Sequence, residues 1–224
     1  MADNKFPHLK GTIFIVTYGR SGSTLLQSIL QSIPGSHIVG ENFNVLEGLF
    51  RTSQRVRNAR RKWGGKEHPD NHPWYNADKI RPVSFEKSVV DIFVQDVIKP
   101  PKDVRWYGFK EIRFPALGND FTAYLNFHKR NFPNAFFVFN SRKGEDVANS
   151  AWWKKKPRKE VLEMVQDMDK RFADFASANP ECSHHVFFED TIKDAASLKP
   201  LFDKIGEPFD LPLIQKLLKR PAAH

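Results

Sequence analysis

Three features are scarce or missing in this 224-residue sequence, and each absence excludes a class of protein. The only cysteine, Cys182, cannot form a disulfide within the chain, and residues 180–183 are typical of a polar turn rather than of a nucleophile site. No apolar run approaches the roughly 20 residues that a membrane helix needs, and residues 1–10 lack the apolar stretch of a signal peptide. No Asn-x-Ser/Thr sequon occurs. We therefore expect a cytoplasmic protein without a transmembrane segment.

The composition is that of a folded domain with an excess of positive charge. Hydrophobic residues make up 40% of the chain and include 20 phenylalanines, which is enough for a sizeable core and too many for a disordered chain. The length favours one large domain over residues 1–224. Lysine and arginine outnumber aspartate and glutamate by 35 to 26, and this net charge of +9 favours an anionic ligand, substrate or surface.

Hydrophobic periodicity predicts alternating strands and helices. The β-branched and aromatic run at residues 12–18 stops at Gly19, as a buried strand entering a turn does. Residues 23–33 then carry apolar side chains at helical spacing and end before a Pro-Gly pair. The same patterns predict further strands at residues 37–39, 106–110, 135–139 and 186–188, and helices at residues 84–98 and 159–178. Such alternation predicts an α/β fold with a central, mostly parallel sheet flanked by helices.

Residues 63–82 break this pattern. Tryptophan, glycine, proline, histidine, aspartate and asparagine crowd together there without periodicity, which predicts a long loop. Loops of this length in folded domains are more often functional than idle. We therefore expect a substrate-facing insertion within the single domain rather than a linker.

The first motif that carries chemistry lies between the first strand and the first helix, at residues 19–26 (GRSGSTLL). Turn N–H groups, the hydroxyls of Ser23 and Thr24 and the positive end of a helix dipole would converge there, which suits phosphate or sulfate. The alternative is an ordinary strand-to-helix turn with a serine N-cap. The lysine of a nucleotide triphosphatase loop is missing and Arg20 lies in the turn instead. The acid pair at 189–190 could still orient Mg²⁺ in a P-loop kinase.

A second motif follows the strand predicted at residues 135–139. Arg142 stands at the strand end, and Ser150 lies eight residues later, about two turns into the next helix. Both side chains can face one phosphate if the chain between them curls back. Taken alone, an arginine in this position is more often a surface ion-pair former.

Together the two motifs resemble those of sulfotransferases that use 3′-phosphoadenosine 5′-phosphosulfate (PAPS). Residues 18–30 resemble the 5′-phosphosulfate loop of that family, and residues 141–150 resemble its 3′-phosphate element. Residues 186–190 and 201–209 look like segments found late in these enzymes, so the resemblance spans about residues 12–212. Arg20 stands where the cytosolic small-molecule branch carries lysine. In having arginine there, the sequence resembles the glycan and tyrosyl-protein branch and several bacterial members.

The resemblance implies a single P-loop-like sulfotransferase domain and assigns roles to residues of both motifs. Arg142 and Ser150 would take the 3′-phosphate. The 5′-phosphosulfate would contact Arg20, Ser21, Gly22, Ser23, Thr24 and Leu25. No metal is required, because fixed lysine and arginine charges replace it. The spacing of His68 and His72 suggests a metal site, but the prolines beside them break the helix that would align the imidazoles, and we interpret the segment as loop.

Transfer to a hydroxyl requires a group that accepts its proton and positive charge that stabilises the departing phosphate. The Val-Gly-Glu-Asn segment around Glu41 resembles the element that supplies the base in the Arg-Ser-Gly branch, which makes Glu41 the expected base. Glu41 could instead pair with a nearby arginine, and His37 and His128 are the alternative bases. Lys110, in a segment similar to a lysine-containing strand end of related enzymes, would stabilise the transferring group, with Arg20 at the bridging oxygen.

Two clusters of basic residues bear on the acceptor. They lie at residues 51–66 and 154–159, and solvated helix faces explain most such runs. The first precedes the irregular loop, where Trp63, Trp74 and Tyr75 offer planar surfaces that stack on sugar or aromatic rings. We therefore expect the acceptor to be a small molecule or glycan with an anionic group, and the acceptor hydroxyl to belong to a carbohydrate or glycolipid. We expect no specific nucleic-acid partner. The alternatives are a P-loop kinase that uses ATP and Mg²⁺ and a non-enzymatic polyanion-binding module.

Overall fold

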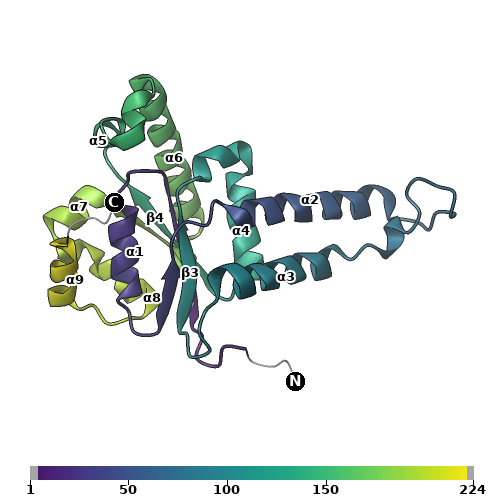
Figure 1. Ribbon diagram of the computed structural model, residues 1–224, viewed down its shortest axis with the longest axis horizontal. Helices are drawn as coiled ribbons and strands as arrows, with labels where there is room; N and C mark the ends of the chain where they lie inside the picture. The colour runs from purple at the N-terminus through teal and green to yellow at the C-terminus, as the bar shows by residue number, and fades with distance from the viewer. Residues whose placement is uncertain (1–4, 221–224) are drawn as a thin grey trace.

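The computed structural model describes residues 5–220 and has a five-stranded parallel sheet at its centre (Figure 1). The strands lie in the order β2-β3-β1-β4-β5, so the first strand of the chain is the middle of the sheet. Their bounds are Gly11–Thr17 for β1, Ser36–Val39 for β2, Trp106–Glu111 for β3, Ala135–Ser141 for β4 and Ser183–Phe187 for β5. Every pairing between these strands is parallel, which confirms the predicted α/β class.

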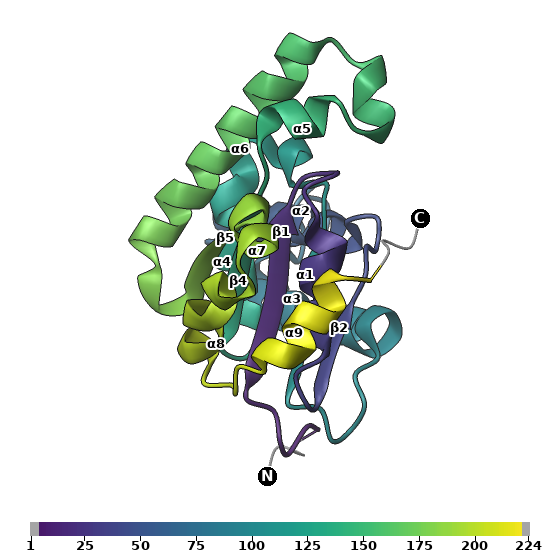
Figure 2. The ribbon, with the colours of Figure 1, turned by 90° about the vertical axis from the view of Figure 1, so that its left-hand side faces the viewer.

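Helices cover both faces of the sheet, as Figures 1 and 2 show. One face is covered by α1 (Ser23–Gln31), α8 (Lys199–Ile205) and α9 (Leu211–Leu218). The other face carries α2 (Val45–Trp63), α3 (Pro82–Phe93), α4 (Phe121–Asn131), α5 (Gly144–Ala148) and α6 (Arg158–Ala178). The short α7 (Phe188–Lys193) directly follows β5.

Short segments of other helical types connect these elements. A π-helical turn, η2 (Val94–Ile98), extends α3. The 3₁₀ segments are η1 (Ala77–Lys79), η3 (Phe114–Asp120), η4 (Ala151–Lys155), η5 (Pro180–Cys182) and η6 (Ala195–Leu198). No helix within residues 5–220 is both long enough and apolar enough to cross a membrane.

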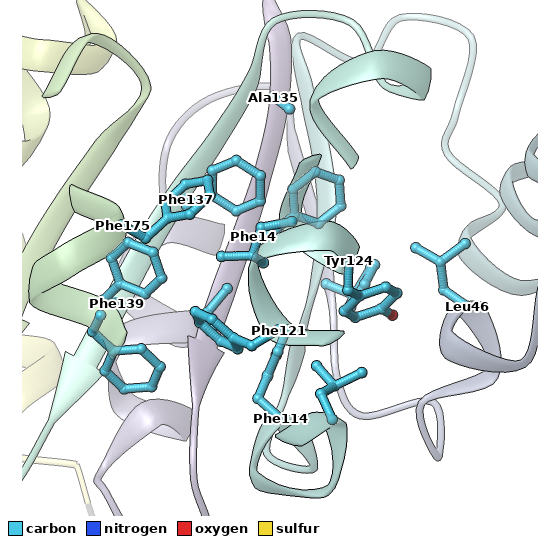
Figure 3. Close-up of a cluster of buried hydrophobic side chains, with 14 of the residues drawn as sticks. Phe14, Leu46, Phe114, Phe121, Tyr124, Ala135, Phe137, Phe139 and Phe175 are labelled. Carbon is cyan, nitrogen blue, oxygen red and sulfur yellow. The ribbon is translucent and has the colours of Figure 1, made fainter. Parts of the chain in front are cut away.

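Side-chain alternation along β1 supplies both halves of the core. Phe14 and Val16 pack into the layer of α2 to α6, and Ile13 and Ile15 pack into the layer of α1, α8 and α9. The first layer is rich in phenylalanine (Figure 3). Phe14 and Phe109, for example, meet edge to face with ring centroids 5.1 Å apart. The abundance of phenylalanine in the sequence thus serves mainly to fill one side of the sheet.

The register of the parallel strands brings their carboxyl ends to one edge. Val16 of β1 pairs with Glu111 of β3 and Phe139 of β4, so the segments that follow these strands leave the sheet at the same level. β2 pairs with β3 over Ser36–Val39, which places Glu41 at that edge as well. Open α/β sheets bind ligands outside the carboxyl ends of their strands, so this edge is where a site is expected.

The structure corrects the extent of several predicted elements. Helix α2 continues to Trp63 and α3 begins at Pro82, so the irregular loop forms the tip of a projecting α2–α3 hairpin and contains η1 (Figure 1). We call this hairpin, residues 45–93, the arm. The strand predicted at residues 186–188 is β5, which begins earlier and ends at Phe187 because Phe188 already starts α7.

His128 of α4 lies in the aromatic core rather than at the carboxyl edge of the sheet. Its side chain is fully buried and packs against Phe14 and Phe132, and Nδ1 lies 2.8 Å from the Tyr124 carbonyl oxygen. Burial lowers the pKa of His128 to about 4. The surrounding core therefore holds His128 as a neutral imidazole at neutral pH.

We expect the buried His128 to weaken folding in acid. Its folded-state pKa of about 4 lies below the ordinary value of 6.5, so between these pH values the unfolded chain binds a proton that the folded chain does not. Stability is therefore lost as the pH falls through this window. Replacing His128 with Phe should reduce the loss of unfolding free energy between pH 7 and pH 4.5 by about 2 kcal/mol in urea denaturation. His8, which is exposed, is the control, and a pH dependence that is the same in both variants would contradict the prediction.

Candidate active site

A cavity of about 550 Å³ opens at the carboxyl edge of the sheet. Its wall contains residues at or after the ends of all five strands: Arg20, Glu41, Lys110, Arg142 and Phe188. The remaining lining residues are Gly22, Ser23, Thr24, Leu25, Ser28, Ile112, Trp152, Ile192, Leu217, Leu218 and Arg220. Four of the lining residues are cationic and one, Glu41, is acidic, so the cavity favours an anionic ligand.

The turn after β1 and the start of α1 form one wall of the cavity. Arg20 (φ 69°) and Gly22 (φ 82°) both have left-handed backbone conformations, and α1 begins at Ser23. A Cβ atom at Gly22 would lie 2.2 Å from the Phe188 ring, so only glycine fits between the turn and α7. The amino end of α1 carries partial positive charge, and Ser23 and Thr24 bring hydroxyl groups to the same wall. This geometry suits a group of the size and charge of phosphate or sulfate.

Ser21 differs from the other residues assigned to this turn. Its side chain is fully buried beneath the turn, where Thr17 Oγ1 lies 2.7 Å from Ser21 Oγ. The Asn140 side-chain amide donates a 2.9 Å hydrogen bond to the Ser21 carbonyl oxygen. Ser21 therefore ties the turn to β1 and β4, and it can offer a ligand only its backbone N–H group.

The two phosphate motifs of the sequence contact each other. Arg20 Nε donates to Ser150 Oγ at 2.9 Å, and Arg142 Nη1 donates to the Arg20 carbonyl oxygen at 3.1 Å. Ser150 follows α5 in an extended conformation, not two turns inside a helix as its spacing predicted, and it does not line the cavity. Arg142 Nε is buried and has no hydrogen-bond partner among residues 5–220. A bound anion would satisfy this donor.

Aromatic side chains that the sequence did not single out shape this end of the cavity. The Arg142 guanidinium lies 4.7 Å from the centroid of the Phe188 ring, and the Arg20 guanidinium lies 5.8 Å from that of Trp152. The Trp153 indole donates a 3.0 Å hydrogen bond to the carbonyl oxygen at the start of the turn. The tandem tryptophans are visible in the sequence, but their periodicity does not indicate which way they face.

A partly buried network supports the backbone from which Arg142 extends. The Tyr18 hydroxyl accepts a hydrogen bond from the Arg142 N–H group and donates to Asp169 Oδ1, both at 3.0 Å. Ser141 Oγ also donates to Asp169 and lies 2.7 Å from His185 Nε2. Burial raises the pKa of the Tyr18 hydroxyl and of the Asp169 carboxyl, and it lowers the pKa of His185 to about 4. Hydrogen bonds to Tyr18, and through it to Asp169, therefore fix the backbone position of Arg142.

Glu41 and Lys110 form an ion pair in the cavity wall. Lys110 Nζ donates to Glu41 Oε1 at 2.6 Å, and Arg113 Nη1 donates to Glu41 Oε2 at 3.1 Å. The Lys110 side chain is 7% exposed, whereas that of Glu41 is 32% exposed. Glu41 thus does pair with a nearby arginine, but its carboxylate also remains accessible from the cavity. A carboxylate and a lysine placed side by side can accept a proton and stabilise developing negative charge.

Neither alternative base faces the cavity. His37 Nε2 lies 2.8 Å from the Ile98 carbonyl oxygen, and His128 is in the aromatic core. His68 and His72 stack on each other in the arm, with ring centroids 4.1 Å apart. In the part of the chain that the structure describes, no group of three or more His, Cys, Asp or Glu residues is placed to hold a metal ion.

The arm carries the first basic cluster, and none of its residues lines the cavity. Arg57 on α2 forms a 2.7 Å ion pair with Glu86 on α3, which joins the two helices. Trp63, the last residue of α2, stacks on Trp74 of the connecting loop at a centroid distance of 5.1 Å. The second basic cluster, residues 154–159, begins in η4 beside the cavity wall.

The comparison with protein-family models identifies one family, and the comparison with solved structures finds similar folds. A family model described as "Sulfotransferase family" matches residues 12–210. The sulfotransferase domain from the Synechococcus PCC 7002 olefin synthase is similar in structure, with a TM-score of 0.55 and 19% identity over 99% of this chain and 80% of that one. The sulfotransferase domain from the curacin biosynthetic pathway has a TM-score of 0.52 and 18% identity over 96% of this chain and 80% of that one. Retinol dehydratase, solved with androsterone and the inactive cofactor PAP, has a TM-score of 0.40, 15% identity, and coverage of 93% and 63%. The comparison with curated proteins gave no match.

Gly22 should be essential for the shape of the turn after β1. Gly22→Ala creates a left-handed alanine whose Cβ collides with the Phe188 ring, and we expect the free energy of unfolding to fall by roughly 2 to 4 kcal/mol. Adding Phe188→Ala removes the collision but not the backbone strain. The double variant should therefore be less destabilised in urea unfolding than the sum of the single variants, and strict additivity would argue against the contact.

Proposed function

Because the chain belongs to the sulfotransferase family, we propose that it transfers the sulfuryl group of PAPS to an acceptor hydroxyl, with Glu41 as the base. The observation that carries the proposal is the ion pair of Glu41 and Lys110 in the wall of a cavity that also contains Arg20 and Arg142. PAPS has two separate anionic ends, a 5′-phosphosulfate and a 3′-phosphate. An enzyme that transfers its sulfuryl group to a hydroxyl therefore needs two linked anion sites and a proton acceptor near the site of the phosphosulfate.

The residues around the cavity fit this donor. The amino end of α1, with Ser23, Thr24 and the backbone of Gly22, would hold the 5′-phosphosulfate. Arg142 would hold the 3′-phosphate, and Ser150 would assist by fixing Arg20. The buried Arg142 Nε without a partner among residues 5–220 supports this assignment, because a phosphate oxygen would satisfy it. When bound, PAPS supplies an activated bond between sulfur and its 5′-phosphate oxygen.

Glu41 and Lys110 divide the work of transfer between them. Glu41 accepts the proton of the acceptor hydroxyl as that oxygen bonds to sulfur and the bond from sulfur to the 5′-phosphate oxygen breaks in line. Lys110 stabilises negative charge on the transferring group, and Arg20 does so on the bridging oxygen. In the free protein Lys110 and Arg113 occupy both oxygens of Glu41. Each carboxylate oxygen has a second lone pair, so Glu41 can accept the proton while Lys110 stays beside it.

The acceptor in this proposal is a carbohydrate or glycolipid hydroxyl whose molecule also carries an anionic group. Helix α2 exposes Arg55, Arg61 and Lys62 along the arm, and the stacked Trp63 and Trp74 lie beyond them. Cations and planar rings in this order suit an anionic saccharide. Because the arm lies outside the cavity, only an acceptor long enough to extend from Glu41 to the arm can use these residues.

Glu41→Gln and Arg142→Ala should separate catalysis from donor binding. Glu41→Gln should lower kcat by at least about 100-fold, since it removes the proton acceptor, while the Kd for 3′-phosphoadenosine 5′-phosphate stays within about twofold. Arg142→Ala should raise that Kd roughly 10- to 100-fold, because it removes charged hydrogen bonds to the 3′-phosphate. Calorimetric titration without metal measures the Kd.

The same titration with ATP and Mg²⁺ tests the kinase alternative. Tighter binding of ATP–Mg²⁺ than of the 3′,5′-bisphosphate would contradict the donor assignment. Parent-like turnover in Glu41→Gln would mean that another group accepts the proton, and an unchanged bisphosphate Kd in Arg142→Ala would place the 3′-phosphate elsewhere. Steeply salt-dependent heparin binding that Glu41→Gln leaves unchanged, without bisphosphate binding, would favour the polyanion module.

Charge reversal on the arm should affect only long anionic acceptors. Arg60→Glu combined with Arg61→Glu should raise the KM for a sulfated or carboxylated oligosaccharide several-fold and leave the donor KM unchanged, since neither residue lines the cavity. Lys102→Glu combined with Lys199→Glu makes the same change in net charge at exposed positions outside the arm and the cavity, and is the control. An acceptor KM that stays unchanged, or rises equally in both variants, would remove the arm from acceptor binding.

A further inference from the structure

Glu111 is a buried carboxylate for which the reaction scheme has no role. It is the last residue of β3, directly after Lys110, and its side chain has 0% exposure. It does not line the cavity. A carboxylate is unfavourable in the interior unless hydrogen bonds and opposite charge compensate for lost hydration. The groups that provide this compensation indicate what the residue does.

Five N–H groups from two chain segments converge on Glu111. Oε1 accepts from the backbone N–H groups of Ile112 at 2.7 Å and Arg113 at 3.1 Å, and from Arg113 Nη1 at 2.7 Å. Oε2 accepts from the backbone N–H groups of Asn44 at 2.7 Å and Asn42 at 3.4 Å. The first segment follows β3, and the second directly follows the proposed base. Glu111 therefore joins the segment that carries the base to the strand that carries Lys110.

The segment after Glu41 needs such an anchor. Phe43 (φ 59°) and Asn44 (φ 55°) are consecutive non-glycine residues in the left-handed region. Asparagine tolerates this conformation, but for Phe43 it is strained and persists only where surrounding contacts fix it. Asn44 is buried, and its Oδ1 accepts a 3.1 Å hydrogen bond from the Tyr124 hydroxyl, whereas Phe43 is 81% exposed. The restraint on this backbone thus comes from Tyr124 and, through the main-chain N–H groups, from Glu111.

Arg113 extends the same restraint to the carboxylate of the base. Its Nη1 donates both to Glu111 Oε1 at 2.7 Å and to Glu41 Oε2 at 3.1 Å. Its guanidinium also lies 4.5 Å from the centroid of the Phe43 ring. Because Arg113 holds Oε2 of Glu41, the other oxygen, Oε1, is left to face Lys110.

We propose that Glu111 is a positioning residue for sulfuryl transfer. It fixes residues 42–44 and Arg113, and through them it holds the Glu41 carboxylate against Lys110 in the geometry from which the proton is taken. This inference rests on the proposed function of Glu41 as the base. It requires no contact between Glu111 and either substrate, so donor binding should not depend on it.

Glu111→Gln tests the proposal because it removes the charge and turns one acceptor oxygen into an NH₂ group that faces N–H donors. We expect kcat to fall roughly 10- to 100-fold, the range produced by a small misplacement of a reacting group. The donor KM and the Kd for 3′-phosphoadenosine 5′-phosphate should stay within about twofold. Glu111→Asp keeps the charge, but its shorter side chain cannot reach both segments as well, so kcat should fall several-fold and by less than in Glu111→Gln.

Glu207 is a matched control for the loss of a buried carboxylate. Its side chain is also 0% exposed, and it accepts hydrogen bonds from Trp106 Nε1 at 2.8 Å, from Arg105 at 2.7 Å and from Lys10 at 2.7 Å. These contacts lie at the opposite end of β3 from Glu111. Glu207→Gln should therefore lower the melting temperature as Glu111→Gln does, while its kcat stays within about twofold of the parent.

The three Gln variants, including Glu41→Gln, are measured in one series well below their melting temperatures. A loss of kcat in Glu111→Gln without a comparable loss in Glu207→Gln supports the proposal. The positioning role of Glu111 is overturned by a parent-like kcat in Glu111→Gln or by an equal loss of kcat in Glu207→Gln. If Glu41→Gln is inactive in the same series, Glu41 is still the base in either case. An active Glu41→Gln contradicts the proposed function itself. If Glu111→Gln does not fold, Glu111→Asp decides, and a parent-like kcat in that variant overturns the proposal.

Discussion

Parallel pairing of the strands is the constraint on which the rest of this structure depends. Because all five strands run in one direction, their carboxyl ends meet at a single edge of the sheet. β1 at the centre supplies the turn with Arg20, and its neighbours β3 and β4 bring Lys110 and Arg142 to either side of it. The edge strand β2 adds Glu41 beyond β3. No single segment contains the site, and the strand register assembles it.

The cations in and beside the cavity have two different kinds of partner. Lys110 and Arg113 are paired with Glu41, and Arg113 is paired with the buried Glu111 as well. Arg142 has no acidic partner within residues 5–220, and contacts a carbonyl oxygen and an aromatic ring instead. A cation without a carboxylate partner is available to bind an anionic ligand, whereas a cation paired with a carboxylate can orient that carboxylate. One side of the cavity therefore suits anion binding and the other suits proton transfer.

Much of the fold and part of the candidate site could be predicted from the sequence, because the signals involved are local. The run at residues 12–18 predicted β1, and the apolar spacing at residues 23–33 predicted α1. The predicted site residues Arg20, Glu41 and Lys110 do line the cavity. The same reasoning is less decisive where a residue type has several environments. His128 was an alternative base, yet it lies among phenylalanines. The Ser21 hydroxyl is buried beneath the turn, which leaves its backbone N–H group as the predicted ligand contact.

The sequence by itself determined the succession of strands and helices along the chain and the positions of the two phosphate motifs between them. Both follow from periodicity and from residues close together in the chain. Only the tertiary structure decided which distant residues meet: Arg20 with Ser150, and Glu111 with Asn44. It also decided that the α2–α3 arm lies outside the cavity and that Phe188 closes over Gly22. These outcomes depend on strand register and on packing between layers. Local patterns carry no record of either, because the interacting residues are far apart in the sequence.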